Sequence, residues 1–407
     1  MTNEKSPFPH FMSTSIQKQV IIYMMKILYI ATANPFVRSG GGIANLAYYK
    51  ALNHLYPNSV DMVLPEEQVP TNYSIHRIFP AKRRSKLSKL MAFLAGSIHR
   101  YKECVSDILK KEKYDICFIN GGLYAGDMMS IFKEARVKTI VMHHNFEREY
   151  QSTVYSNLLF KHYYVSYTIK NERNAYLNAD VNLFITNEDK KLFEKTYGKT
   201  HALNRVIGVF EPSSVKINDY KNKNNIFTAV ISGSVNADQT VAGIRDFHDN
   251  YWDVLKNVIP NYELIFTGRN ADRLYSVFHD FNDKHIKIIP NPDDINEIVS
   301  MAHLYICPIN VGGGLKLRVM DGLRMGLPVL THQVSARGYE PFFSKPYFRV
   351  YHDKKTFEEG LKDLIHYIQN DSSNSCKKNE YDSIFGIDKG VDRFRNLINQ
   401  LKEQKII

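Results

Sequence analysis

Residues 307–330 read CPINVGGGLKLRVMDGLRMGLPVL, and this stretch decides the fold of the second half of the chain. An apolar strand ends at Cys307, three glycines follow at Gly312, Gly313 and Gly314, and we expect Lys316 to lie in the first turn of a helix. Free backbone N–H groups, the positive end of the helix dipole and the Lys316 ammonium would then converge on one spot. The pattern therefore predicts a diphosphate-binding site.

The carboxylate of Asp321 follows this site in the sequence. Asp321 lies five residues beyond Lys316, where its two oxygens could accept both hydroxyls of a ribose. Arg318 and Arg324 stand three residues to either side, so an ion pair on the surface of the helix is the alternative interpretation.

Short β-rich runs alternate with helical stretches on both sides of this block. In the first half the expected strands are residues 26–31, 60–64, 115–120, 138–143 and 181–186, with helices at 43–53, 86–110 and 155–178. In the second half the expected strands are centred on Ala229, Leu264, Lys287, Tyr305, Val329 and Arg349. The alternation predicts an α/β protein with two Rossmann-like, doubly wound parallel sheets, whose ligands bind at the carboxyl ends of the strands.

The length of 407 residues favours two domains rather than one. The polar stretch at residues 215–225, VKINDYKNKNN, is the best candidate for the junction. We therefore expect an N-terminal extension at 1–24, a first domain at 25–214, a second domain at 215–380, and a C-terminal helix at 381–407 that packs back on the first domain.

Two further glycine-containing turns follow predicted strands. In the first domain, residues 38–45 read RSGGGIAN, and Gly41 and Gly42 open a helix whose N–H groups could receive phosphate. In the second domain, Ser232, Gly233 and Ser234 close the first strand, where glycine permits close approach and the hydroxyls can donate to phosphate oxygens. A plain strand-to-helix turn explains each of them about as well.

Residues 143–148, HHNFER, follow the fourth predicted strand of the first domain. His144 and Glu147 place an imidazole and a carboxylate at a strand end, where they suit proton transfer or binding of sugar hydroxyls. Local hydrogen bonds within the loop are the alternative.

Positive charge is concentrated in the first half of the chain. Lys and Arg outnumber Asp and Glu by 53 to 42 overall, and by 27 to 17 in residues 1–200. Residues 70–102 contain no acidic side chain, and residues 89–98, KLMAFLAGSI, add apolar side chains. The mixture predicts a surface that lies on anionic lipid headgroups, and a solvated helix face is the alternative. The cations assigned to this surface are Lys82, Arg83, Arg84, Lys86 and Lys89.

Several classes of protein are disfavoured by what the sequence lacks. The four cysteines are far apart, which indicates neither a disulfide framework nor a structural zinc and favours a reducing compartment. The apolar stretch at residues 20–33 is interrupted by Lys26 and is too short for a membrane span, and it lacks the flanks of a signal peptide. No pair of aspartates has D-x-D spacing, so we expect no metal site.

The block at 307–330 resembles the nucleotide-binding segment of retaining GT-B-fold glycosyltransferases that build bacterial polysaccharides. The resemblance continues through residues 232–235, TGRN at 267–270, and IPNPDD at 289–294, which brings in Pro290 and Asn291. It implies that Lys316 binds the donor diphosphate with the amides of Gly312, Gly313, Gly314 and Leu315, and that His144 lies beside the transferred sugar. Asp321 stands where a glutamate usually holds the ribose, and Gly313 stands where a glutamate often contacts the sugar.

The resemblance implies a hexosyl-type glycosyltransferase that needs no cofactor, retains the anomeric configuration and works without a metal. Its donor would be a nucleotide-sugar, with UDP favoured over GDP, and its acceptor a glycan or lipid-linked molecule in cell-surface polysaccharide or glycoconjugate synthesis. We expect a cytoplasmic protein on the inner face of the membrane that binds no nucleic acid. A non-catalytic partner subunit, or a sugar-nucleotide epimerase or hydrolase on the same fold, remain alternatives.

Overall fold

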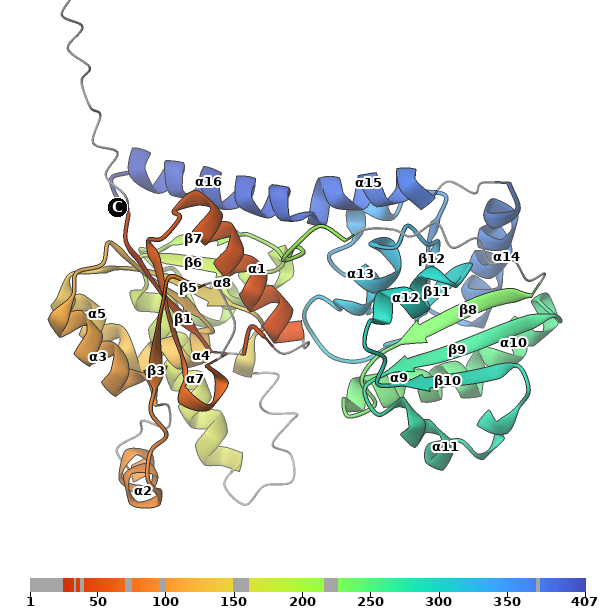
Figure 1. Ribbon diagram of the computed structural model, residues 1–407, viewed down its shortest axis with the longest axis horizontal. Coiled ribbons are helices and arrows are strands. Elements are labelled where there is room, and N and C mark those ends of the chain that lie inside the picture. Colours follow the sequence, from red (N-terminus) through yellow and green to blue (C-terminus); the bar gives the residue numbers. More distant parts are fainter. Residues whose placement is uncertain are drawn as a thin grey trace, which may run out of the picture.

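A computed structural model describes residues 25–32, 34–36, 40–69, 75–94, 100–148, 161–215, 226–370 and 374–407. The expected N-terminal extension, Arg38 and Ser39 of the first glycine turn, and most of the expected linker lie outside these residues. The described chain forms two α/β domains, each built on a parallel sheet (Figure 1).

The first domain contains a seven-stranded parallel sheet in the order β3-β2-β1-β4-β5-β6-β7. Its strands are β1 (Ile27–Ala31), β2 (Val60–Pro65), β3 (Arg77–Ala81), β4 (Ile116–Asn120), β5 (Lys138–His143), β6 (Val181–Phe184) and β7 (Leu203–Val206). The helices are α1 (Gly40–Leu55), α2 (Lys86–Leu94), α3 (Tyr101–Lys111), α4 (Gly122–Ala125), α5 (Met129–Ala135), α7 (Lys161–Asn178) and α8 (Asn187–Tyr197), with 3-10 turns η1 (Glu66–Gln68) and η2 (Gly126–Met128).

The second domain contains a six-stranded parallel sheet in the order β10-β9-β8-β11-β12-β13. Its strands are β8 (Phe227–Ser232), β9 (Tyr262–Gly268), β10 (Ile286–Pro290), β11 (Leu304–Cys307), β12 (Val329–His332) and β13 (Phe348–Tyr351). The helices are α9 (Asp238–Asn250), α10 (Trp252–Val258), α11 (Leu274–Val277), α12 (Ile295–Ser300), α13 (Arg318–Leu323) and α14 (Lys354–Asn370), with 3-10 turns η3 (Ala271–Arg273), η4 (His279–Asn282) and η5 (Glu340–Phe342).

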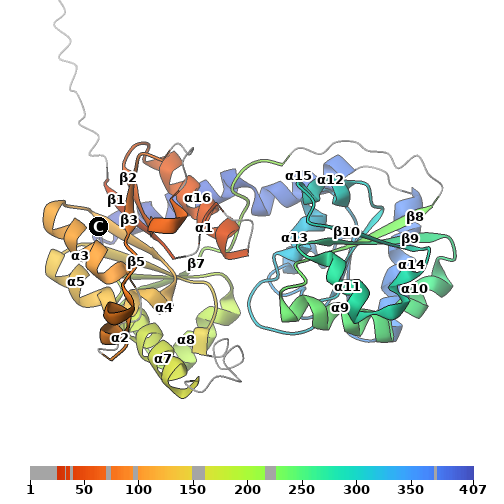
Figure 2. The ribbon, with the colours of Figure 1, turned by 60° about the horizontal axis from the view of Figure 1, so that its bottom comes forward.

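Helices cover both faces of each sheet, and this explains why the central strands are apolar throughout. In β1, Ile27, Tyr29 and Ala31 belong to one core cluster, whereas Leu28 and Ile30 belong to the cluster on the opposite face. A parallel strand buried on both faces loses the alternation of polar and apolar residues that a half-exposed strand keeps. Figure 2 shows this layering from a second direction.

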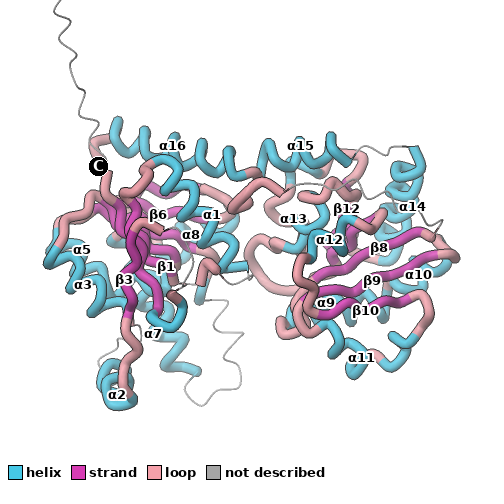
Figure 3. The backbone as a smooth tube through the Cα atoms, viewed as in Figure 1, coloured by secondary structure: helices cyan, strands magenta, loops and turns pink. Residues whose placement is uncertain are grey.

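The last two helices, α15 (Asn374–Phe385) and α16 (Ile387–Glu403), lead from the second domain back across the first (Figure 3). Phe394 of α16 packs edge-on against Tyr48 of α1 and Phe210 of the interdomain segment. Arg393 donates to the carbonyl oxygens of Ile207 at 3.0 Å and Val209 at 3.3 Å. The C-terminal helices therefore tie the interdomain segment to the first domain.

The predicted fold class is confirmed, and the differences are local. The edge strands β3 and β7 were not predicted, because their side chains are mostly half-exposed, β3 contains Pro80 and β7 has polar residues at its centre. The helix predicted at 86–110 is described as α2 and α3, separated by residues 95–99, which lie outside the description. The C-terminal helix was expected to begin at residue 381, but the polar sequence from residue 374 is already helical and forms α15.

Candidate functional site

The strand ends that carry the predicted site residues lie next to one another within each sheet. In the first domain, Ala31 of β1 is opposite Asn120 of β4, and Asn120 is opposite Met142 of β5. In the second domain, β8 and β11 are neighbours and end at Ser232 and Cys307. Parallel strands end at a common edge, so the loops that follow them share one rim of each sheet.

The ammonium of Lys316 lies beside the glycine loop, residues 312–316, and donates to two oxygen atoms of the second domain. Lys316 is only 7% exposed, and its Nζ donates to the carbonyl oxygen of Gly313 at 2.7 Å and to Oε1 of Gln239 at 3.1 Å. Burial, with a contribution from the charge of Arg337, lowers the pKa of Lys316 to about 8. Neither hydrogen-bond partner carries a negative charge, so an anionic ligand would gain from this ammonium.

The expectation that Lys316 lies in the first helical turn is wrong. Helix α13 begins at Arg318, two residues later, and is six residues long. Lys316 instead lies in a turn. Its own carbonyl oxygen accepts from the Val319 N–H at 3.1 Å and from the Tyr339 hydroxyl at 2.9 Å. These bonds hold the lysine backbone in place, so its position depends on the loop rather than on the helix start.

Each of the three glycines has a different environment. Gly312 has a φ of +89°, and a Cβ atom there would lie 2.8 Å from the side-chain amide carbon of Gln239. Gly314 has a φ of +69°, and a Cβ atom there would lie 2.8 Å from Oδ1 of Asn145 in the first domain. A Cβ atom on Gly313 would have no neighbour within 4 Å. Gly312 and Gly314 are therefore required by the backbone and by crowding, whereas Gly313 leaves open space.

Leu315, the fourth predicted amide donor, anchors the loop with its side chain. It packs against the core of the second domain and lies close to Gly338, where a Cβ atom would be 2.6 Å from Leu315 Cδ1.

Asp321 is buried and is engaged by three side chains. Its Oδ2 accepts from Ser232 Oγ at 2.7 Å and lies 3.4 Å from Arg318 Nη1, and its Oδ1 pairs with Arg324 Nη2. Both arginines of the ion-pair alternative thus contact it; the pair with Arg324 is buried, whereas the Arg318 side chain is 35% exposed. The binding of ribose by Asp321 stays a prediction.

The two serines of the turn at residues 232–234 differ in their hydrogen bonds. Ser232 Oγ lies 2.6 Å from the Tyr305 hydroxyl and donates to Asp321, so this hydroxyl is committed to internal contacts. The Gly233 N–H donates to Thr267 at 2.9 Å, and the Ser234 carbonyl accepts from the Ala237 N–H at 3.1 Å. The half-buried Ser234 side chain remains the better candidate for a phosphate contact.

Pro290 and Asn291 lie on the same rim but farther along the sheet. Pro290 ends β10 and pairs in register with Gly268 of β9, and Asn291 donates to the Gly268 carbonyl oxygen at 2.9 Å. Strand β9 separates them from β8. The structure therefore does not bring them into contact with Lys316 or Asp321 within the described hydrogen bonds.

The histidine loop, residues 143–148, contains two imidazoles with different environments. His143 is stacked on Phe184 at 5.3 Å and bonded to Asn182 Oδ1 at 3.0 Å, so it belongs to the core. His144 Nε2 is bonded to Oδ1 of Asn120. Burial lowers the pKa of each of these histidines to about 4, so both are neutral at pH 7.

A buried polar network fixes the tautomer of His144. The Asn120 amide nitrogen donates to the Tyr29 hydroxyl at 2.9 Å and also to Asn45 Oδ1, which leaves the Asn120 oxygen to accept. His144 therefore carries its proton on Nε2, and its Nδ1 is an acceptor. The network uses β1, α1 and β4 to orient one side chain at the end of β5.

Glu147 contributes its backbone to a buried contact. Its N–H donates to Glu172 Oε2 at 2.5 Å, and the Tyr197 hydroxyl donates to Glu172 Oε1 at 2.6 Å. Burial raises the pKa of Glu172 to about 7. Glu172 of α7 thus holds the backbone of the histidine loop in place. The catalytic role of Glu147 stays a prediction.

The remaining predicted residues are divided between α1 and α2. Gly41 is exposed and Gly42 is buried in the first turn of α1. Helix α2 projects from the body of the first domain (Figure 1), and its Leu87 and Met91 are 70% and 60% exposed. Lys82, Arg83, Lys86 and Lys89 are also exposed.

Arg84 does not belong with this exposed group. It forms a bidentate pair with Glu103 of α3 at 2.6 and 2.8 Å, and its side chain is 8% exposed. Arg84 therefore holds the base of α2 against the domain, and its assignment to the membrane surface is corrected on this ground. We call the remaining exposed set, Lys82, Arg83, Lys86, Leu87, Lys89 and Met91, the α2 patch.

Sequence reasoning missed the residues that act through other residues. Gln239 and Asn120 orient Lys316 and His144, while Glu172 and Glu211 are buried carboxyl groups. Asn120 had a detectable signal, since it is a polar residue that ends an apolar strand. Gln239 lies 77 positions before Lys316 and had none.

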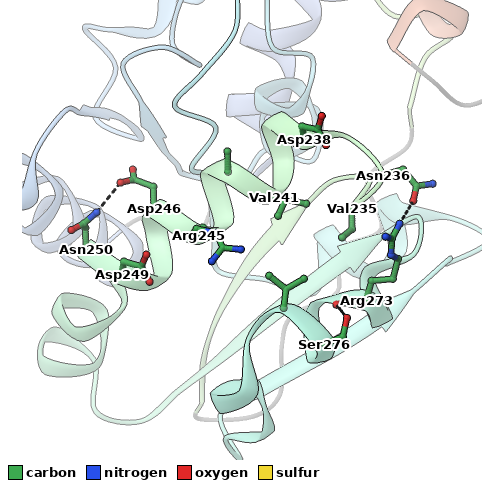
Figure 4. Close-up of a pocket in the computed structure, with 12 residues that line it drawn as sticks. Val235, Asn236, Asp238, Val241, Arg245, Asp246, Asp249, Asn250, Arg273 and Ser276 are labelled. Carbon is green, nitrogen blue, oxygen red and sulfur yellow. Dashed lines mark hydrogen bonds between the residues drawn. The ribbon is translucent and has the colours of Figure 1, made fainter. Parts of the chain in front are cut away.

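A separate hollow of about 800 Å³ lies between α9 and α11 (Figure 4). Arg245 and Arg273 line it together with Asp238, Asp246 and Asp249. None of the predicted site residues lines it. Its mixed charge favours no ligand class.

No group of three or more His, Cys, Asp or Glu side chains in the described ranges has the arrangement of a metal site. None of the described helices combines the length and apolarity that crossing a bilayer requires.

No protein-family model matches the chain, and no curated protein matches it in sequence. Solved structures do match. Sucrose-phosphate synthase from Thermosynechococcus elongatus superposes with a TM-score of 0.70 at 12% identity, over 93% of this chain and 100% of that one. HepE of Anabaena in complex with UDP gives 0.66 at 12% identity, over 93% and 100%. The lipopolysaccharide outer core galactosyltransferase WaaB gives 0.67 at 11% identity, over 92% and 99%. The likeness shows that this chain has the GT-B fold.

Proposed function

We propose that this GT-B-fold protein is a glycosyltransferase that takes a sugar from a nucleotide-sugar donor and passes it to an acceptor hydroxyl. The observation that carries the proposal is the meeting of the glycine loop with the histidine loop at Gly314 and Asn145. It places a buried ammonium and a neutral imidazole, one from each domain, on facing loops. HepE, which shares the fold, has been crystallised with UDP and with UDP-glucose, and this favours a UDP-sugar here.

In the proposed reaction, the bond between the anomeric carbon and the diphosphate oxygen breaks, and its electron pair leaves with the diphosphate. The acceptor oxygen bonds to the anomeric carbon on the same face and passes its proton to the departing diphosphate oxygen. Negative charge develops on the leaving group, where the Lys316 ammonium and the amides of the glycine loop would stabilise it. We infer that these fixed positive groups take the part of a metal ion, so the reaction is metal-independent.

His144 would serve the sugar rather than the diphosphate. Its Nε2 proton is held by Asn120, so Nδ1 is the atom available to accept a hydrogen bond from a sugar hydroxyl. The low pKa keeps this acceptor neutral throughout the physiological range. Asp321 would hold the ribose with whatever acceptor capacity its internal partners leave.

We further propose that the protein works at the cytoplasmic face of a membrane, in the synthesis of a cell-surface polysaccharide or glycoconjugate. The α2 patch supports this location, because two exposed apolar side chains lie one helical turn apart among four exposed cations. A lipid-linked acceptor would then reach the first domain while the second domain binds the donor.

Product analysis tests the reaction. The protein is incubated with a panel of UDP-sugars and candidate acceptors, with a chelator in excess and without it. A glycosylated acceptor of retained configuration, formed equally in both conditions, is the expected result. Release of only free sugar or an epimer would favour a hydrolase or epimerase, and no turnover of bound donor would favour a non-catalytic partner.

A further inference from the structure

A buried chain of contacts connects the donor-binding region to the segment that joins the two domains. Asp321 Oδ1 pairs with Arg324 Nη2, and Arg324 Nη1 lies 3.4 and 3.5 Å from the two carboxylate oxygens of Glu211. The side chains of Asp321 and Glu211 are 5% exposed and that of Arg324 is 11% exposed. One guanidinium therefore bridges two buried carboxylates.

Glu211 lies where the chain crosses between domains. It belongs to the segment between β7 and β8, and its N–H donates to the Phe385 carbonyl oxygen at 2.8 Å. Its carboxylate also accepts from the Tyr381 hydroxyl. Both partners belong to α15, which continues into α16 on the first domain. Glu211 is thus held by the elements that set the interdomain connection.

The other end of the chain of contacts reaches the predicted donor site. Asp321 Oδ2 accepts from Ser232 Oγ at 2.7 Å, and Ser232 ends the strand before the donor-binding serine turn. Arg318 Nη1 lies 3.4 Å from the same oxygen. Two carboxylates and two guanidiniums therefore balance in charge; the Arg318 side chain is 35% exposed, so Arg324 is the guanidinium that is buried with both carboxylates.

Arg324 is positioned by these carboxylates. Its Nε is buried and has no hydrogen-bond partner within the described structure, so both of its directional polar contacts are to Asp321 and Glu211. Weakening one contact would let the guanidinium move toward the other carboxylate. In a poorly solvated site, such a movement changes how much negative charge Asp321 presents to a ligand.

We propose that Arg324 is a positioning residue that makes ribose binding at Asp321 depend on Glu211, a residue of the interdomain segment that does not touch the donor. The inference rests on the proposed function, since it assumes that Asp321 holds the ribose of a nucleoside diphosphate. It assigns a role to two buried charges that the diphosphate chemistry leaves unused. The donor site and the interdomain connection would share one buried guanidinium.

Calorimetric titration of UDP and of pyrophosphate separates this role from a structural one. Glu211→Gln removes the second carboxylate, so Arg324 should pair more tightly with Asp321 and reduce the affinity for UDP at least fivefold. Pyrophosphate has no ribose, so its affinity should stay within twofold of the unmodified protein. Arg324→Lys keeps one charge but cannot bridge both carboxylates; its ammonium should pair with Asp321, the nearer of the two, and so also weaken UDP selectively. It serves as the second variant if Glu211→Gln does not fold.

Glu380→Gln is the matched control. Glu380 lies on α15 and, like Glu211, accepts from a tyrosine hydroxyl and a cation, here Tyr347 and Lys345, but none of its described contacts is with Arg324. Its UDP affinity should be unchanged even if its melting temperature falls.

Equal loss of UDP and pyrophosphate binding, or unchanged UDP affinity in the folded variants, would overturn the inference alone. Failure of the unmodified protein to bind UDP would overturn the proposed function and this inference with it. A selective loss of UDP affinity in both variants, with the control unchanged, supports the inference.

Discussion

A Cβ atom on Gly314 would lie 2.8 Å from Oδ1 of Asn145, so the two domains meet at a position where only a glycine fits. The φ of +69° at Gly314 adds a second requirement for glycine. Since Gly314 precedes Lys316 by two residues and Asn145 follows His144, this contact sets the spacing between the proposed diphosphate-binding and sugar-binding groups.

Alanine substitution in the glycine loop tests this spacing. Gly314→Ala forces an alanine into the left-handed backbone conformation and creates a clash with Asn145. We therefore expect a large loss of turnover and weaker nucleotide binding. Gly313→Ala is the matched control, because its Cβ would meet nothing within 4 Å. Transfer assays and UDP titrations on both variants check the difference. Equal behaviour of the two variants would show that the Gly314 contact does not matter for the reaction.

The two histidines provide a contrast within one loop. His144→Ala should lower turnover more than it lowers UDP affinity, because its proposed partner is the transferred sugar. His143→Ala should mainly lower the melting temperature, since it leaves a cavity beside Phe184 and Phe193. Steady-state kinetics, UDP titration and thermal unfolding distinguish the two effects. Normal turnover in a destabilised His144→Ala variant would assign that histidine to the structure alone.

The parts of the fold and site that depend on residues close together in the sequence could be predicted. Buried strands such as β1 and β4 are apolar runs, and the glycine loop is a local pattern, so both could be predicted. The short strand β7 and the polar helix α15 depend on contacts with distant segments, such as that between Tyr381 and Glu211. Gln239 and Asn120 were not predicted for the same reason, because their hydrogen-bond partners are distant in the sequence.

The helix start at Lys316 shows a different kind of error. Three glycines before an apolar periodic segment predict an early helix, but Gly312 and Gly314 take positive φ values and extend the turn. The hydroxyl of Tyr339 then caps the Lys316 carbonyl from a loop that no local pattern connects to it.

The α2 patch predicts binding to anionic vesicles. Sedimentation with liposomes should increase with the fraction of anionic lipid and decrease as salt rises, because exposed charges are screened within about 10 Å at 0.1 M. Leu87→Ser with Met91→Ser should reduce binding, as should replacing Lys82, Arg83, Lys86 and Lys89 by Ser. Phe343→Ser, which alters an exposed apolar residue of the second domain, should have no effect. If the unmodified protein ignores anionic vesicles at low salt, the acceptor is not presented on a membrane bound by this patch.

The affinity for UDP should depend on pH through Lys316. Its pKa of about 8 means that the ammonium is present at pH 7 and is mostly neutral at pH 9 in the absence of a bound anion. Affinity should therefore fall as the pH rises through this range. Lys316→Arg keeps its charge at every pH in the range and should flatten the dependence, while the larger group should lower the affinity itself. A flat profile for the unmodified protein would remove the link to Lys316.

The measurement that tests the central claim most directly is calorimetric titration of UDP into the unmodified protein and into Lys316→Ala. We expect the unmodified protein to bind UDP and the substitution to remove about 1.5 to 3 kcal/mol of binding free energy, the worth of a hydrogen bond to a charged group. This corresponds to an affinity roughly 10- to 150-fold lower. Absence of UDP binding in the unmodified protein, or equal affinity in a folded Lys316→Ala variant, would contradict it.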